Sequence, residues 1–291
     1  MTSASNGVRT PARSDGEVAG ASARPAGLLR EVAIPILMYH QVLPAAPASF
    51  RKYTVTAKAF QAQMRWLAVA GYTTIGLDDL LANRRTGKAL PRKPVVITFD
   101  DGFQGCWDYA VPVLQAHGFT ATFYLVAGLM GDSSRWLARE GAIEFPLMNW
   151  STARALHAAG FTCAAHTVTH PRLADVSHTE CREELERSRA ILEHELGCVV
   201  DHLAYPFGSL RAETKTLAAE LGYRSAVSVK VGLSQPRDDV LALHRVPISG
   251  EEGFSDFVCR LRTAHAVREM MRRTPRRLLN GLRRAISGPV R

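Results

Sequence analysis

The sequence predicts an α/β fold in which the strands of a parallel sheet alternate with helices. Four helical segments end in a glycine that is followed by an aromatic residue and a strand-like run, at Gly71-Tyr72, Gly118-Phe119, Gly160-Phe161 and Gly222-Tyr223. A glycine in the left-handed conformation commonly ends a helix, so each pair indicates the passage into the next strand. Such alternation indicates a parallel sheet, but the pattern leaves open whether that sheet is open or closed into a barrel.

The strands are expected wherever a short apolar run rich in β-branched or aromatic residues is bounded by turn residues. These runs are 33–39, 72–75, 94–99, 119–125, 161–165, 202–205, 224–229 and 241–247. The first of them ends on His40, a polar residue at the end where an α/β barrel places its active site.

Helices are expected at 56–69, 104–117, 151–159, 177–196 and 210–221. The first begins at Thr56, a good helix cap, and carries Phe60, Met64 and Leu67 on one face. The helix at 104–117 is predicted despite Pro112. Residues 42–55 are expected to form a loop, and the irregular segments 130–149, with Trp136, and 230–240 are expected as loops on the catalytic face.

Composition predicts one folded domain at 31–258 between two different ends. A chain of 291 residues could hold two domains, but α/β barrels use more than about 200 residues as one unit. Residues 1–30 lack periodicity and predict a disordered leader without the apolar stretch of a secretory signal, so we expect a cytoplasmic protein. The five cysteines lack Cys-x-x-Cys spacing and are odd in number, which favours a reducing compartment or buried thiols.

The positive charge lies in the C-terminal tail, residues 259–291. Ten of the 36 basic residues and one of the 27 acidic residues lie within 260–291, which leaves 26 of each sign in the rest of the chain. No nucleic-acid-binding surface is therefore predicted. Thr274-Pro275 is typical of a helix start, and an apolar stripe bordered by arginines follows at Leu278, Leu279, Leu282 and Ile286. Such a helix either packs on the folded domain or contacts an anionic membrane, and both interpretations stay open.

Two polar patterns follow strand-like runs and together indicate a metal site. The run at 95–99 ends on Asp100, Asp101 and Gly102, and the run at 161–165 is followed by His166 and His170. Two adjacent buried carboxylates repel each other unless a cation or a shared proton compensates. Histidines four residues apart can hold one ion together, and Asp plus two His leaves positions open for water and substrate. Each pattern alone is more often a turn or a surface pair, so the argument depends on the combination.

These residues resemble the motifs of the polysaccharide deacetylase family, also described as NodB homology or carbohydrate esterase family 4. Thr98-Phe99-Asp100-Asp101-Gly102 matches the first motif, His166-Thr167-Val168-Thr169-His170 matches the second, and Tyr205-Pro206-Phe207-Gly208 is similar to a variant of the third. The resemblance covers most of residues 33–250 and points to a Tyr-Pro-Phe-Gly subgroup. It implies a distorted (β/α) barrel, commonly with seven strands.

The resemblance also implies a role for each site residue. Asp101, His166 and His170 would hold a divalent metal, with zinc as first choice and nickel, cobalt, iron or manganese as alternatives. Asp100 would be the general base that assists attack by metal-bound water on the amide carbonyl. The turn formed by Tyr205, Pro206 and Phe207 would bind the oxyanion through the Phe207 N–H. Ala204 stands where many members carry an arginine that orients the catalytic Asp, so either another residue holds Asp100 or its proton affinity is tuned differently.

Two histidines compete for the role of general acid. His40 ends the first strand in Leu37-Met38-Tyr39-His40, which is similar to the opening motif of the Tyr-Pro-Phe-Gly subgroup. His244, in Leu241-Ala242-Leu243-His244, only loosely resembles the final family motif. We favour His40.

The expected activity is therefore metal-dependent removal of an N-acyl group, with acetyl as first choice, from an amino-sugar glycan. A polymer, a nucleotide sugar and a lipid-linked precursor all remain open as substrates, and a lipid-linked one would suit a tail on the inner membrane face. The alternative is a carbohydrate-binding or scaffold protein that has kept the barrel and lost turnover.

Overall fold

Seven parallel strands close into a barrel in the computed structural model, which describes residues 33–266 and residue 269. Around the barrel the order is β1 (Ile36–Tyr39), β10 (Leu243–Pro247), β9 (Ser225–Val231), β8 (His202–Ala204), β7 (Thr162–Ala165), β6 (Thr122–Leu125) and β5 (Pro94–Phe99). Strand β5 then pairs with β1, which closes the ring. The eighth expected strand, β4 (Thr73–Thr74), pairs with the start of β5 and lies outside the barrel. The prediction of a seven-stranded (β/α) barrel is confirmed.

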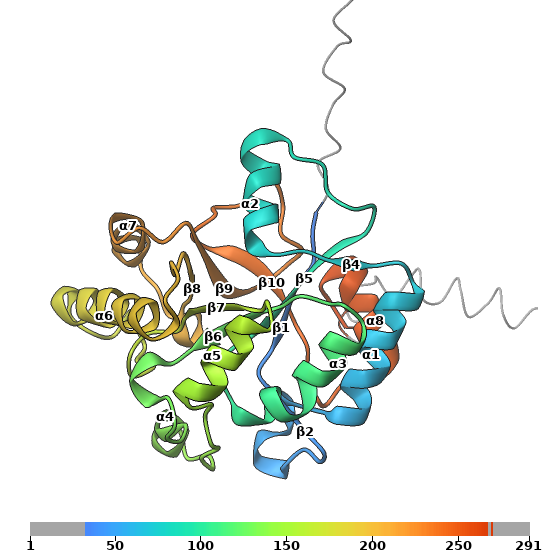
Figure 1. Cartoon of the computed structure of the whole chain (residues 1–291), viewed down its shortest axis with the longest axis horizontal. Helices are drawn as coiled ribbons and strands as arrows, with labels where there is room; N and C mark the ends of the chain where they lie inside the picture. Colours follow the sequence, from blue (N-terminus) through green and yellow to red (C-terminus); the bar gives the residue numbers. More distant parts are fainter. Residues whose placement is uncertain (1–32, 267–268, 270–291) are drawn as a thin grey trace, which may run out of the picture. The chain divides into compact units, whose positions relative to one another are not determined.

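Helices surround the barrel in the order in which they occur in the chain (Figure 1). They are α1 (Ala57–Val69), α3 (Val111–Ala116), α5 (Trp150–Ala158), α6 (His178–Leu196), α7 (Ala212–Glu220) and α8 (Phe254–Thr263). Thr56 caps α1 by accepting a hydrogen bond from the Ala59 N–H at 3.2 Å. The four helix-ending glycines all have positive φ, with Gly160 at 86° as the largest, so the glycine-aromatic pattern marked real helix ends.

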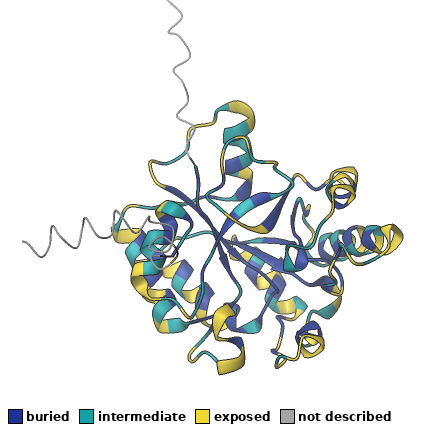
Figure 2. Ribbon diagram, turned by 180° about the vertical axis from the view of Figure 1, so that it is seen from behind, coloured by how far each residue is buried: buried dark blue, intermediate teal, exposed yellow. Residues whose placement is uncertain are grey.

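One apolar layer of the barrel interior is formed by a single side chain from each of the seven strands. Figure 2 shows that buried residues line the strands and the inward faces of the helices. The interior layer consists of Ile36, Val96, Tyr124, Ala164, Ala204, Val227 and Leu243. Helix α2 (Leu77–Thr86) packs Leu77 and Leu80 against this layer, next to the beginning of β5. Because the amino-terminal end is covered, the opposite end of the barrel is left for the functional site.

Several expected elements differ in the structure. The helix predicted at 104–117 starts with a π-helical turn, Cys106–Ala110, and only then becomes α3. Pro112 has no N–H to donate, which accounts for a widened turn before it. The segment expected as a loop at 42–55 contains β2 (Gln41–Leu43), a 3₁₀ turn (Ala48–Tyr53) and β3 (Thr54–Thr56). Helix α2 was not expected either, because its apolar stripe is too short to be distinctive.

Of the two segments expected as loops on the catalytic face, 130–149 and 230–240, only the first lies on that face. Ser234, in the segment 230–240, exchanges backbone hydrogen bonds of 2.9 Å with Ile34, so this segment passes the amino-terminal end of β1. The expectation for 230–240 is therefore wrong. The segment 130–149 is confirmed on the catalytic side, because the Met148 N–H donates to the Gly102 carbonyl at 2.9 Å, and it contains a short helix, α4 (Arg135–Arg139).

The leader at 1–30 and residues 267–268 and 270–291 of the basic tail lie outside the described residues. Helix α8 continues from Phe254 to Thr263 and thus crosses the domain boundary expected at residue 258. None of the helices within residues 33–266 combines the length and apolar character needed to cross a membrane.

Candidate metal centre

Asp101, His166 and His170 come together at the carboxyl end of the barrel. Asp101 follows β5, and the two histidines belong to the loop after β7. Asp101 Oδ1 lies 3.3 Å from His166 Nε2 and 3.2 Å from His170 Nε2. All three side chains are buried. The predicted aspartate and histidines thus form one compact cluster of metal-ligand type.

The backbone around this cluster adopts unusual conformations. Asp101, Thr167, His170 and Phe207 are four of the five described non-glycine residues with positive φ, with values of 76°, 66°, 61° and 57°. The left-handed region is disfavoured for residues with a side chain and persists only where the surroundings enforce it. At Asp101 this conformation bends the chain directly after β5, so that Asp100 and Asp101 both turn into the site rather than to opposite faces.

The histidine rings are fixed by contacts on their other sides. His166 Nδ1 lies 2.7 Å from the Ala204 carbonyl oxygen and donates its proton there, which leaves Nε2 to face Asp101. The His170 ring stacks on Trp136 with centroids 4.3 Å apart and meets the Phe207 ring at 4.7 Å. Burial lowers the pKa of the His170 imidazole. Both rings are therefore held in one orientation, with Nε2 toward Asp101.

The geometry and chemistry of the cluster fit a divalent metal. In a tetrahedral site with metal–ligand bonds of about 2.0–2.1 Å, neighbouring ligand atoms lie roughly 3.3 Å apart. The separations of 3.2 and 3.3 Å between Asp101 Oδ1 and the two Nε2 atoms agree with that value. Burial acts to raise the pKa of the Asp101 carboxyl, but hydrogen bonds from His166 and His170 outweigh it and hold the pKa far below its usual range. One anionic oxygen and two imidazole nitrogens are a donor set typical of zinc and neighbouring metals.

Asp100 is held by an arginine that the sequence analysis did not identify. Arg245, on β10, binds Asp100 through two parallel hydrogen bonds of 2.7 Å. The same guanidinium donates to the Ser228 carbonyl at 2.9 Å and to Thr98 Oγ1 at 3.2 Å, and its side chain is fully buried. Burial acts to raise the pKa of Asp100, whereas the charge and hydrogen bonds of Arg245 lower it below the usual value. Arg245 therefore takes the place of the arginine that Ala204 replaces.

The two candidate acids occupy different environments. His40 Nε2 lies 4.0 Å from Asp100 Oδ2, and its ring contacts Tyr53 with centroids 5.1 Å apart. Burial lowers the pKa of the His40 imidazole, and the charges of Asp101 and Asp100 offset only part of this effect. His244 precedes Arg245 on β10, so its side chain points to the outer face of the barrel, where Nδ1 lies 3.0 Å from Asp238 Oδ2. The structure brings His40 to Asp100 and does not bring His244 there.

The third motif forms a tight turn beside the histidines. Tyr205 is buried and donates its hydroxyl to the Leu241 carbonyl at 2.9 Å, while the Gly208 N–H donates to the Tyr205 carbonyl at the same distance. Pro206 and Phe207 form the turn between them, and the Arg172 guanidinium stacks on the Phe207 ring at 4.0 Å. The turn is therefore placed against His170.

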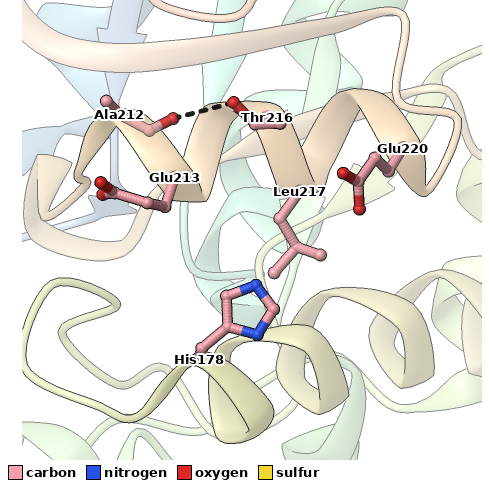
Figure 3. A pocket seen from close by; sticks show the side chains of 6 residues that line it. All are labelled: His178, Ala212, Glu213, Thr216, Leu217 and Glu220. Carbon is pink, nitrogen blue, oxygen red and sulfur yellow. Dashed lines mark hydrogen bonds between the residues drawn. The ribbon is translucent and has the colours of Figure 1, made fainter.

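A pocket of about 280 Å³ lies away from this centre, between α6 and α7 (Figure 3). His178 at the start of α6 faces Glu213, Leu217 and Glu220 of α7 across it. It contains none of the residues that surround Asp101.

Comparison with known proteins agrees with this arrangement. Residues 87–226 match the family model described as polysaccharide deacetylase. YxkH of Bacillus subtilis, whose name assigns it to the polysaccharide deacetylases, is 29% identical over 216 residues, which cover 74% of this chain and 71% of YxkH. Poly-β-1,6-N-acetyl-D-glucosamine N-deacetylase of Escherichia coli K12 is 36% identical over 87 residues, 30% of this chain and 13% of that protein.

A solved structure shares the fold. The Streptococcus pyogenes deacetylase PplD superimposes with a TM-score of 0.70 at 24% identity, covering 79% of this chain and 99% of PplD. The barrel, the sequence motifs and the matched family model lead to the same assignment. Residues 87–226 of this chain are thereby assigned to a polysaccharide deacetylase domain.

Proposed function

We propose that this chain is a metal-dependent hydrolase that removes the N-acetyl group from an amino sugar within a glycan. The observation that carries the proposal is the contrast between two adjacent carboxylates. Asp101 contacts His166 and His170, whereas Asp100 is bound by Arg245 and lies outside the ligand cluster. A site that only bound sugar would have no use for a second, separately held carboxylate.

Each residue has a task that its surroundings support. Asp101, His166 and His170 would hold a divalent metal. When bound, such a metal polarises the amide carbonyl and lowers the pKa of water, so that water loses a proton more easily and becomes a better nucleophile. Asp100, kept ionised by Arg245, would accept the proton of the attacking water. The amide C–N bond then breaks, and acetate and a free amine leave.

Two further groups would complete the reaction. The Phe207 N–H, presented by the turn at Tyr205, Pro206 and Phe207, would donate to the developing oxyanion. His40, whose Nε2 lies 4.0 Å from Asp100 Oδ2, would give a proton to the departing amine. These two assignments rest on position in the described structure and on the family resemblance.

The experiment that tests the proposal is acetate release from an N-acetylglucosamine oligomer, with and without added zinc. The E. coli relative is named as an N-deacetylase of poly-β-1,6-N-acetyl-D-glucosamine, which makes such an oligomer the first choice. A deacetylase releases acetate and generates free amines in equal amounts. A carbohydrate-binding protein without turnover would retain the oligomer and release none, which would establish the alternative function.

The roles of His40 and His244 make a direct prediction. We expect His40→Ala to lower kcat for acetate release by about 10²–10⁴-fold, the usual effect of removing a general acid, at unchanged metal content. His244→Ala should have a small effect, because His244 pairs with Asp238 on the outer face of β10. Steady-state kinetics of both variants on one oligomer check this. The reverse order of effects would move the acid role to His244.

The proposal extends to the cellular location of the protein and to the kind of glycan it acts on. We propose a cytoplasmic enzyme whose basic tail contacts anionic membranes, which would suit a lipid-linked glycan precursor. The support is the sequence pattern at Leu278, Leu279, Leu282 and Ile286 with its neighbouring arginines. Sedimentation with anionic vesicles should decrease when the chain is ended at Arg273 or when salt is raised. Unchanged or absent sedimentation would leave the tail without this role.

A further inference from the structure

The loop that carries both histidines is held from two opposite sides. On one side, the segment after β6 donates from the Ala127 N–H to the Thr167 carbonyl at 3.0 Å and from the Gly128 N–H to the Val168 carbonyl at 2.9 Å. The two backbones approach so closely that a Cβ atom at Gly128 would lie 2.6 Å from the Val168 oxygen. These contacts fix the carbonyl groups of the loop but leave its N–H groups to another partner.

That partner is Glu184, a residue of α6. Its Oε2 atom accepts hydrogen bonds from the Val168 N–H at 2.7 Å and from the Thr169 N–H at 3.0 Å. Its Oε1 atom accepts from the Thr169 hydroxyl at 2.6 Å. Two consecutive N–H groups of the loop therefore point at one carboxylate oxygen. One carboxylate therefore satisfies three donors between His166 and His170.

We infer that Glu184 is a positioning residue that sets the spacing of His166 and His170 for metal binding. This inference rests on the metal site proposed above. Hydrogen bonds to an ionised carboxylate are roughly twice as strong as neutral ones, so Glu184 can offset the cost of the left-handed conformations at Thr167 and His170. It acts through the backbone of the loop and is not itself a ligand.

The test is the zinc affinity of the full chain, measured by competition with a chromophoric chelator. Glu184→Ala leaves three donors without their partner, and we expect zinc to bind about 10–100-fold more weakly, as for other residues that orient metal ligands. Glu184→Gln should lose less, because its carbonyl oxygen can still accept from both N–H groups without the charge. Glu183→Gln is the matched control, since this neighbouring residue is exposed, and its zinc affinity should equal that of the wild type.

Thermal unfolding of the zinc-free variants separates positioning from general stability. If Glu184 only stabilised the fold, its variants would melt earlier without zinc but bind zinc as tightly as the wild type when folded, and that result would overturn the inference. Should Glu184→Ala fail to fold, Thr169→Val removes only the hydroxyl bond to Oε1. Unchanged zinc affinity in Thr169→Val and Glu184→Gln would equally overturn it. A wild-type chain that binds no zinc would instead refute the metal site itself.

Discussion

We expect Asp100→Asn to lower the rate of acetate release by about 10²–10⁴-fold while the chain keeps its metal. Asparagine has nearly the same shape as aspartate and still offers one oxygen to Arg245, but it cannot accept the proton of the attacking water. His166→Ala, in contrast, removes a ligand and should remove both metal and activity. Elemental analysis and rate measurement on the same preparations of both variants test the separation of base and ligand.

Asp108→Asn serves as the matched control for this experiment. Asp108 lies on the surface of the π-helical turn after β5, where it accepts a hydrogen bond from Gln104 at 2.9 Å. Its replacement should change neither metal content nor rate. Loss of metal in Asp100→Asn to the same extent as in His166→Ala would mean that Asp100 is a ligand rather than the base.

The second large effect is expected at Arg245. Arg245→Met removes one partner of a fully buried ion pair and leaves the Asp100 charge uncompensated, which typically costs about 3–5 kcal/mol of stability. Chemical denaturation measures this loss. The double variant Asp100→Asn/Arg245→Met should recover part of it, because the uncompensated charge of Asp100 is removed as well. Arg182→Met is the control, since Arg182 pairs with Glu220 at the surface and such pairs contribute about 0–1 kcal/mol.

The pH dependence of Arg245 variants follows from the direction of the Asp100 shift. In the wild type the lowered pKa of Asp100 contributes stability above the pKa of an unfolded aspartate, about 3.9, and that contribution is lost as the pH falls through the folded value. Replacement of Arg245 weakens the largest of the influences that lower the pKa of Asp100, so burial, which raises that pKa, has more effect. We therefore expect the acidic limb of the pH–rate profile of Arg245→Lys or Arg245→Met to move to higher pH. An unmoved limb would show that Arg245 does not tune the base.

Much of the site was visible in the sequence because its members follow strands. Asp101 comes shortly after the run at 95–99, and His166 comes directly after the run at 161–165. Because both runs are parallel strands, these residues lie at the same end of the barrel. Arg245 was not predicted as a site residue, whereas its neighbour His244 was. Strand alternation contained the missing signal, since Leu243 faces the interior and Arg245 must therefore face it too. Asp100, as a second buried carboxylate next to Asp101, also required a positively charged partner, because an unpaired buried charge is costly.

Other features had no recognisable sequence signal. Glu184 belongs to a helix with acids at several positions, and only the structure shows which carboxylate reaches the loop after β7. The path of 230–240 depends on a backbone pairing between Ile34 and Ser234, residues 200 positions apart. Helix α2 depends on the barrel interior that Leu77 and Leu80 cover. Local patterns identify elements that bury one regular face, whereas these features depend on distant contacts.

A zinc titration of the chelator-stripped chain, followed by acetate release from an N-acetylglucosamine oligomer, tests the central claim most directly. The account predicts no release by the stripped chain, a rise with each addition of zinc, and saturation at one zinc ion per chain. This ratio is expected because residues 33–266 and 269 contain one such cluster, formed by Asp101, His166 and His170. Full release by the stripped chain, or no release at any zinc concentration from a chain that binds the ion, would contradict it.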